Sequence, residues 1–251
     1  LIVGISQSGQ SPDIVSVLEE GRRQGRPRVA ITNDPDSPLA DAADIVVPLN
    51  TGPELAVAAT KTYTAQLAVI SAISEAITGV SAGVTELPVL AARALTTDDQ
   101  ARTAAGRLVD VEHAAVLGRG FNLATAFEWA LKMQELSYVV AQPFSTADFL
   151  HGPVAVVDKG YPVLAVVADG PAAADVKGAV DRAIERGAPT VLLTDTDVAT
   201  TDGVIRFPSA PEWLTPIPAI VAAQLFTYHL TVAQGNDPDS PRGLSKVTKT
   251  T

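Results

Sequence analysis

Short apolar runs alternate along the chain with longer segments whose apolar positions recur every three or four residues. The short runs are typical of buried strands, and the longer segments are typical of helices that cover a sheet. Their alternation predicts an α/β fold in which mainly parallel sheets are flanked by helices. The expected strands are 1–5, 28–32, 45–49, 114–117, 161–167, 190–194 and 204–207, and the expected helices are 13–23, 37–43, 57–77, 98–109, 123–139, 174–186 and 217–234.

The first half of the chain repeats part of the second half. A strand, a loop and a helix precede the strand at Val29, and the same elements at similar spacing precede the strand at Val191. The second half has an additional strand, turn and helix, residues 114–139, in front of this repeat. A duplicated fold explains both observations and predicts that roughly 40–60 further residues precede Leu1.

The repeat predicts two three-layer α/β/α domains in tandem. We expect the first domain over residues 1–84, without a counterpart of residues 114–139. Residues 85–112 are expected to link the halves, residues 113–234 to form the second domain, and residues 235–251 to form a polar tail.

The composition is that of an acidic globular chain with no cysteine. A net charge of −10 argues against a nucleic-acid partner, whose phosphates would be repelled. No run of about eighteen apolar residues occurs and nothing at the amino end resembles a signal peptide, so we expect no membrane partner and a cytoplasmic location. Without cysteine there is no disulfide, thiolate metal ligand or cysteine nucleophile. The histidines His113, His151 and His229 lack a tight metal-ligand spacing, so we predict no metal site.

The loop Ser6-Gln7-Ser8-Gly9-Gln10-Ser11, called the serine loop below, joins the first expected strand to the first expected helix. The first turn of a helix has free backbone N–H groups, and the helix dipole favours negative charge there. Pro12 lies where its missing N–H has no consequence. The hydroxyls and the amide add neutral donors, so the loop favours a phosphate group; the alternative is an ordinary serine-rich helix cap. The candidate phosphate ligands are Ser6, Gln7, Ser8 and Ser11.

Three charged side chains share one face of the expected helix 123–139. Glu128, Lys132 and Glu135 lie at positions i, i+4 and i+7, which recur on the same side of a helix. An ammonium beside a carboxylate can hold the carboxylate ionised and ready to move a proton. From the spacing alone, the more common structure is a solvated Glu–Lys pair worth roughly a few tenths of a kcal/mol.

These segments resemble the sugar isomerase (SIS) domain family, and in particular the tandem SIS pair that forms the isomerase half of glucosamine-6-phosphate synthase. The resemblance covers nearly the whole chain and is specific, because four segments match in order. They are the serine loop, Gly52-Pro53-Glu54-Leu55-Ala56-Val57-Ala58-Ala59-Thr60-Lys61, Glu128-Trp129-Ala130-Leu131-Lys132-Met133-Gln134-Glu135 with the later His151-Gly152-Pro153, and the tail Pro241-Arg242-Gly243-Leu244-Ser245-Lys246. The family binds phosphosugars, pairs two three-layer α/β domains, usually dimerises and needs no metal or organic cofactor for isomerisation.

The resemblance implies a role for each charged residue of the second half. It assigns to Glu135 the transfer of a proton between C1 and C2 of an open-chain sugar phosphate, through an enediol or enolamine. Glu128 and Lys132 then support Glu135 through orientation and charge. His151 is the residue that opens the pyranose ring, and in relatives it reaches into the site of the neighbouring subunit, which implies a homodimer. The hydroxyl-rich segment 145–148 is expected to cap a short helix that fixes the His151 loop.

The resemblance also assigns the loop after the first sheet to the sugar site. Glu54, Val57 and Thr60 are expected to contact the sugar through backbone and side chain. Two departures leave the exact substrate open: Ala59 replaces a serine that is usual in the synthases, and Gln10-Ser11 replaces Glu-Thr.

The carboxy-terminal tail resembles the terminal lid of the family. We expect Lys246 to contact the sugar carbonyl, as an imine or as a stabiliser of developing negative charge. Arg242 and Ser245 are further candidates for binding the substrate. The alternative is a disordered basic tail.

The resemblance predicts an enzyme that acts on an amino-sugar phosphate. The serine loop is expected to hold the phosphate while Glu135, from the other half, removes a proton next to a carbonyl or imine. Because the synthases have a glutaminase domain with a cysteine nucleophile and this chain has neither, we expect a glucosamine 6-phosphate deaminase-isomerase that forms fructose 6-phosphate and ammonia. The alternatives are aldose–ketose isomerisation of a phosphosugar, cleavage of a fructosamine-type phosphate, and a regulator that only senses phosphosugars.

Overall fold

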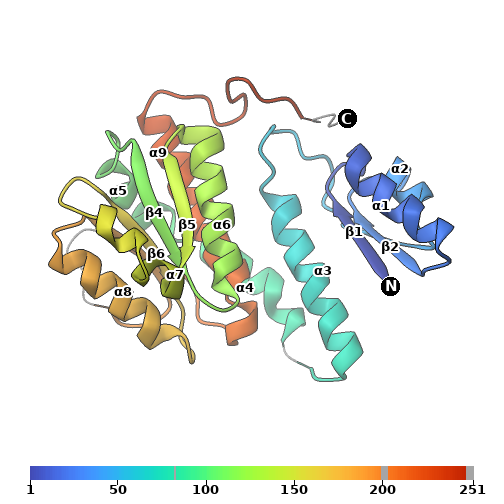
Figure 1. The fold of residues 1–251 in the computed structure, drawn as a ribbon, viewed down its shortest axis with the longest axis horizontal. Helices are drawn as coiled ribbons and strands as arrows, with labels where there is room; N and C mark the ends of the chain where they lie inside the picture. Colours follow the sequence, from blue (N-terminus) through green and yellow to red (C-terminus); the bar gives the residue numbers. More distant parts are fainter. Residues whose placement is uncertain (82, 199–202, 247–251) are drawn as a thin grey trace. The chain divides into compact units, whose positions relative to one another are not determined.

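The computed structural model describes residues 1–81, 83–198 and 203–246 of the chain (Figure 1). Parallel β-sheets are flanked by helices, which confirms the predicted α/β class. The chain forms two compact units. Unit 1 contains Leu1–Ile77 and the tail from Asp239 onward, and unit 2 contains Thr78–Pro238.

The elements of unit 1 are β1 (Ile2–Ser6), α1 (Pro12–Arg23), β2 (Arg28–Thr32), α2 (Pro38–Asp41), β3 (Ile45–Pro48) and α3 (Lys61–Thr78). The strands form a parallel sheet in the order β1-β2-β3. The helices α1 and α2 place Leu18 and Leu39 against Ala30 of β2, and these buried side chains form the core of the unit. Burying each of the two leucine side chains stabilises the unit by about 1.5–3 kcal/mol.

The register of β1 and β2 decides where the loops of unit 1 begin. The two strands pair in parallel from Ile2 with Arg28 to Ser6 with Thr32. The serine loop and the loop that follows β2 therefore start side by side at the carboxyl edge of the sheet. This edge is where α/β sheets bind their ligands.

The strands of unit 2 are β4 (His113–Gly118), β5 (Val140–Ser145), β6 (Val163–Val167), β7 (Thr190–Thr194) and β8 (Gly203–Arg206). They form a parallel sheet in the order β5-β4-β6-β7-β8. The helices are α4 (Leu87–Leu95), α5 (Asp98–Gly106), α6 (Asn122–Lys132), α7 (Thr146–Leu150), α8 (Ala173–Glu185) and α9 (Pro216–Ala233). Short turns of 3₁₀ or π geometry are η1 (Val84–Glu86), η2 (Met133–Ser137), η3 (Pro153–Val156) and η4 (Glu212–Leu214).

Helices cover both faces of the unit 2 sheet (Figure 1). On one face, Phe149 of α7 and Val180 of α8 pack with Leu192 of β7 in a common core. On the other face lie α5, α6 and α9, where Trp129 and Phe226 meet edge to face with ring centroids 5.4 Å apart. Every residue of β6 is buried, and its sequence is a continuous apolar run. Both are expected of a strand in the middle of a parallel sheet, which helices cover on both faces.

The strand order of the two sheets follows the repeat in the sequence. The order β6-β7-β8 in unit 2 matches β1-β2-β3 in unit 1, and all these strands are parallel. Val29 and Val191, which marked the repeat, lie on the corresponding strands β2 and β7. The strands β4 and β5 extend the unit 2 sheet beyond β6.

Two elements of unit 2 were not predicted from the sequence. The edge strand β5 contains Gln142 and Pro143, which interrupt its apolar pattern; an edge strand tolerates proline because one side of it makes no ladder hydrogen bonds. The helix α4 lies in residues 85–112, the expected link between the halves. In the structure this segment forms η1, α4 and α5 of unit 2, and both helices pack against α9.

Helix α9 is mostly apolar. The segment Glu212–Ala233 is long and apolar enough to cross a membrane by length and composition alone. However, 67% of its apolar 18-residue window is buried inside the structure, and α9 contacts α4, α5 and α6. This burial is typical of the central helix of a globular unit.

Candidate active site

The serine loop uses its own hydroxyls as hydrogen-bond acceptors. The Ser6 hydroxyl accepts from the backbone N–H of Gly9 (3.2 Å), and the Ser8 hydroxyl accepts from the backbone N–H of Gln10 (3.3 Å). In both cases the hydroxyl oxygen is the acceptor, so its hydrogen is left to donate to a further group. The loop therefore presents hydroxyl donors, which suit an anion.

Helix α1 begins directly after the serine loop and adds its own donors. Ser11 is the N-cap residue, and its side chain makes no capping hydrogen bond. Pro12 occupies the first turn and Asp13 follows it. The first-turn N–H groups of a twelve-residue helix carry partial positive charge, which favours a phosphate at this position.

Gly9 holds the serine loop against α2. Its φ of +63° lies in the left-handed region, and its carbonyl accepts from the N–H of Leu39 (3.1 Å). A Cβ at this position would lie 2.0 Å from the hydroxyl oxygen of Ser37, which is fully buried. Only glycine fits both the backbone angle and the space.

Asn33 connects the serine loop to the loop after β3 (residues 49–60). Its backbone N–H donates to the carbonyl of Gln7 (3.1 Å). Its side-chain carbonyl accepts from the N–H (3.1 Å) and the hydroxyl (2.9 Å) of Thr51, and its amide donates to the carbonyl of Gly52 (2.7 Å). This residue was not predicted from the sequence; the available signal was its position directly after a strand, at the carboxyl edge of the sheet.

Glu54 caps helix α3. One carboxylate oxygen accepts from the backbone N–H of Thr60 (3.3 Å) and from the N–H (3.0 Å) and hydroxyl (2.7 Å) of Thr62. The helix expected over 57–77 therefore begins only at Lys61, which corrects its predicted start. Glu54 fixes the loop that carries Val57 and Thr60, the other two residues predicted to contact the sugar.

The described part of the tail lies against this same loop in unit 1. The Lys246 ammonium donates to the carbonyl of Ala56, and the N–H of Val57 approaches the carbonyl of Asp239 at 3.5 Å. The side chains of Arg242 and Ser245 are exposed. These contacts place Lys246 beside the loop predicted to contact the sugar.

In unit 2, the structure brings the three charged residues of the predicted helix face into contact. The Lys132 ammonium lies 3.4 Å from a carboxylate oxygen of Glu128 and 2.5 Å from one of Glu135. The side chain of Lys132 is 5% exposed, that of Glu128 is 10% exposed, and that of Glu135 is 24% exposed. A solvated surface pair is therefore wrong for this group, because only Glu135 reaches solvent to an appreciable extent.

Burial changes the protonation of Glu128. Removal from water raises the pKa of this carboxyl to about 7, although Lys132 lowers it. The negative charge of Glu135 adds to the increase. Near neutral pH, the Glu128 carboxyl beside Lys132 is therefore protonated in part of the molecules.

Replacing Glu128 with Gln should make stability less dependent on pH. Between pH 4.5 and 7, the folded state holds a proton that the unfolded chain has lost, so stability falls as the pH rises through this window. Across this window, the free energy of unfolding of the parent should fall by about 3 kcal/mol relative to that of Glu128→Gln, because the glutamine side chain stays neutral at every pH. Urea unfolding at pH 5 and pH 8.5 measures this difference. The exposed Glu185→Gln is the control; an equal difference between Glu128→Gln and the parent at both pH values would contradict the assignment.

Glu135 lies in a π-helical turn, which corrects the predicted helix 123–139. The α-helix α6 ends at Lys132, and Met133–Ser137 form η2. Tyr138 follows with a φ of 56°, in the left-handed region. Glu135 is therefore presented from a turn geometry that is frequent at functional sites.

His151 is the exposed C-cap residue of α7. The hydroxyl of Ser145 caps the other end: it accepts from the N–H of Asp148 (3.2 Å) and donates to its carboxylate (2.6 Å). This confirms the predicted capped helix. The backbone N–H of His151 donates to Ala147 and Asp148, so its imidazole projects from a short, fixed helix.

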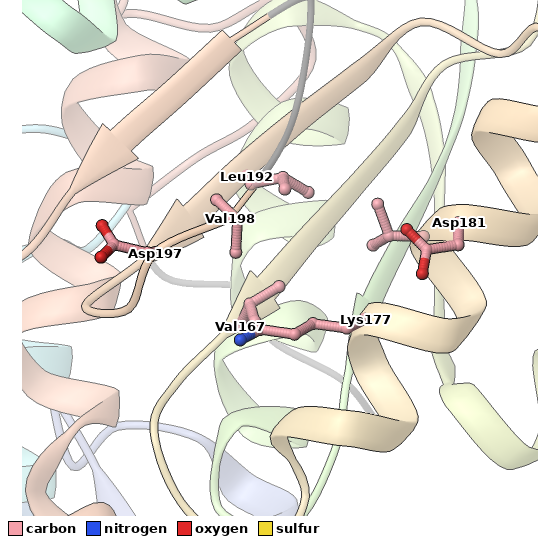
Figure 2. A pocket seen from close by; sticks show the side chains of 7 residues that line it. Val167, Lys177, Asp181, Leu192, Asp197 and Val198 are labelled. Carbon is pink, nitrogen blue, oxygen red and sulfur yellow. The ribbon is translucent and has the colours of Figure 1, made fainter.

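A separate cavity of about 230 Å³ lies between α8 and the sheet of unit 2 (Figure 2). Figure 2 shows Lys177 extending toward Val167, with the carboxylates of Asp181 and Asp197 on opposite sides. None of the predicted site residues lines it. Within residues 1–81, 83–198 and 203–246, no group of three or more His, Asp or Glu side chains is arranged to hold a metal ion.

The predicted site residues thus fall into two groups. The serine loop, the Glu54 loop and Lys246 belong to unit 1, and the Glu128–Lys132–Glu135 group and His151 belong to unit 2. In unit 1 the Ser6 and Ser8 hydroxyls accept from backbone N–H groups of their own loop, and in unit 2 the Glu135 carboxylate contacts the buried Lys132 ammonium.

The SIS domain family matches residues 1–76 and 107–234, and the chain belongs to this family. It is 34% identical over 260 residues to the glutamine–fructose-6-phosphate aminotransferase (isomerizing) of Thermococcus kodakarensis, and 35% identical over 257 residues to that of Pyrococcus horikoshii. These alignments cover 98% of this chain and 43% of each relative, so the chain spans less than half of their length.

Solved structures show the same fold. The C-terminal domain of glucosamine-fructose-6-phosphate aminotransferase from Francisella tularensis superimposes with a TM-score of 0.85 at 28% identity, covering 96% of this chain and 73% of that chain. The glucosamine-6-phosphate deaminase of Thermotoga maritima superimposes with a TM-score of 0.83 at 22% identity, covering 99% and 75%. The chain is therefore homologous to the isomerase half of the aminotransferases and related to phosphosugar isomerases.

Proposed function

We propose that the chain transfers a proton between C1 and C2 of an open-chain amino-sugar phosphate. The specific reaction is the conversion of glucosamine 6-phosphate and water into fructose 6-phosphate and ammonia. The observation that carries this proposal is the partly buried contact of Lys132 with Glu135 in a chain of the SIS family. Relatives named for fructose 6-phosphate and for glucosamine 6-phosphate support the choice of sugar.

The chemistry begins at C2 of the open-chain amino aldehyde. The Glu135 carboxylate removes the C2 proton, the C–H electrons form a C1=C2 double bond, and the carbonyl oxygen takes up a proton to give an enolamine. Glu135 returns its proton to C1, and the nitrogen loses one, which leaves an imine at C2. Water adds to C2, the C–N bond breaks, and fructose 6-phosphate and ammonia leave.

The neighbours of Glu135 have supporting tasks. The Lys132 ammonium stabilises the carboxylate and the negative charge that develops on the enolamine oxygen. Glu128, whose pKa is about 7, limits the charge around Lys132 by being protonated in part of the molecules. His151 opens the pyranose ring, since a neutral imidazole can accept and return a proton near neutral pH.

The residues of unit 1 bind the substrate in this proposal. Ser6, Ser8 and Ser11 donate hydroxyl hydrogens, and Gln7 its amide, to the phosphate at the start of α1. The loop with Glu54, Val57 and Thr60 contacts the sugar. The contact of Lys246 with the Ala56 carbonyl supports a tail that acts as a lid, with Arg242 and Ser245 next to the substrate.

We further propose a tandem pair of SIS domains and a cytoplasmic homodimer. The matching strand orders β1-β2-β3 and β6-β7-β8 support the tandem pair. The exposed position of His151 at the end of α7 supports its use by the site of a partner subunit.

An assay of ammonia release and ketose formation, run in parallel over a panel of sugar phosphates, tests the function. Glucosamine 6-phosphate should release ammonia and form fructose 6-phosphate in equal amounts. Ketose formation from aldose phosphates without an amino group, and no ammonia from any amino sugar, would replace the deaminase with an aldose–ketose isomerase. Saturable binding of phosphosugars without turnover of any of them would contradict an enzyme and favour a sensor.

A further inference from the structure

The turn that carries Glu135 has an uncommon backbone. Its hydrogen bond runs from the N–H of Tyr138 to the carbonyl of Met133, five residues back, which defines a π-turn. Tyr138 then adopts a left-handed conformation that side chains rarely occupy. Both features are unfavourable in isolation and persist only where the surroundings hold them.

A buried pair of hydroxyls ties this turn to helix α9. The Ser137 hydroxyl lies 2.8 Å from that of Thr231, and the two residues are 4% and 0% exposed. The Thr231 hydroxyl donates to the carbonyl of Thr227 (2.7 Å), so its oxygen is the acceptor for the Ser137 hydrogen. This arrangement fixes the direction of the hydrogen bond and the side of the turn that faces α9.

A second contact ties the turn to strand β5. The amide of Gln134 donates to the backbone carbonyl of Ala141 in β5. Glu135 lies between Gln134 and Ser137 in sequence, and its carboxylate contacts Lys132 at 2.5 Å. The turn is therefore held by α9 and β5, while the side chain in its middle reaches the ammonium.

We propose that Ser137 and Thr231 are positioning residues for Glu135. Their hydrogen bond keeps the last turn in the π form and so keeps the Glu135 carboxylate at Lys132. This inference rests on the proposed function, in which Glu135 moves the proton between C1 and C2. A displacement of about 1 Å at a reacting group can cost about a hundredfold in rate, so the loss of the anchor should affect turnover far more than binding.

Single variants of the pair test the proposal. Ser137→Ala and Thr231→Val should each lower kcat about 10- to 100-fold and change KM less than threefold. Thr231→Ser, which keeps the hydroxyl, should restore kcat to within about threefold of the parent. The kcat of the double variant should be no lower than that of the more damaged single variant, because both changes remove the same hydrogen bond.

Thr227→Val is the matched control. This residue lies one turn earlier on α9, is also fully buried, and its hydroxyl donates only to the backbone carbonyl of Ala223 (2.9 Å). The control should lower the melting temperature as much as Thr231→Val and leave kcat unchanged. Equal losses of melting temperature in all three variants with kcat unchanged would overturn the positioning role.

The same assay separates this proposal from the proposed function. If Glu135→Gln abolishes turnover while Ser137→Ala and Thr231→Val do not lower it, only the positioning role fails. If the parent has no turnover, the crystal structure of Ser137→Ala decides: a turn that becomes α-helical and a broken Glu135–Lys132 contact support the inference, and an unchanged π-turn overturns it.

Discussion

Replacing Glu135 with Gln is expected to lower kcat by about a thousandfold, because a glutamine amide cannot accept the C2 proton or return it to C1. The variant keeps the volume of the side chain and a hydrogen-bond acceptor for Lys132. The proposed phosphate ligands belong to unit 1, so affinity for glucosamine 6-phosphate should stay within about threefold of the parent. Steady-state kinetics and titration calorimetry measure the two quantities.

Glu185→Gln is the control for the loss of one carboxylate. Glu185 is exposed at the end of α8 in the same unit. This control should retain the kcat and the affinity of the parent. A Glu135→Gln variant with more than a tenth of the parental kcat would remove Glu135 from the proton transfer and leave the mechanism without its base.

Gly9→Ala is expected to damage both folding and phosphate binding. The left-handed φ of +63° and the 2.0 Å approach of a Cβ to the Ser37 hydroxyl oxygen together should cost about 2–4 kcal/mol. Ser37 cannot easily move, because its hydroxyl donates to the carbonyl of Asp34 (2.7 Å) and accepts from the N–H of Ala40. The serine loop must then shift, so affinity for glucosamine 6-phosphate should fall at least about tenfold. Urea unfolding and calorimetry measure the two effects.

Gly25→Ala separates the backbone angle from the collision. Gly25 has nearly the same φ, +64°, in the same unit, and nothing lies within 4 Å of an added Cβ. Its substitution should cost only about 1–2 kcal/mol and leave the affinity unchanged. Equal stability losses in the two variants, with unchanged affinity in both, would show that the contact with Ser37 does not hold the serine loop.

The sequence was sufficient for features that depend on neighbours along the chain. The strand, serine loop and helix at the amino end are contiguous, so their order was predicted from local residues alone and the structure confirms it. The phosphate site at this loop stays a prediction. The spacing of Glu128, Lys132 and Glu135 likewise predicted a shared face, and the ion pairs confirm the contact. Their burial was not predicted, because it depends on packing between elements that are distant in the sequence.

Features that depend on contacts between distant segments were missed. Asn33 acts through Gln7 and Thr51, which no local pattern connects. Glu54 caps α3 from several residues before its start, so the helix was predicted too early. The π-turn interrupts a helix that the local pattern continues to residue 139, and the hydroxyl that contacts this turn, that of Thr231, lies on the distant helix α9.

The fate of a deuterium label at C2 of glucosamine 6-phosphate tests the central claim most directly, since it follows the proton that Glu135 is proposed to move. By NMR, the parent enzyme should move the label from C2 to C1 of fructose 6-phosphate or release it to water, at the rate of turnover. The Glu135→Gln variant should bind the sugar and leave the label on C2. Loss of the C2 label at the parental rate in this variant would contradict the account.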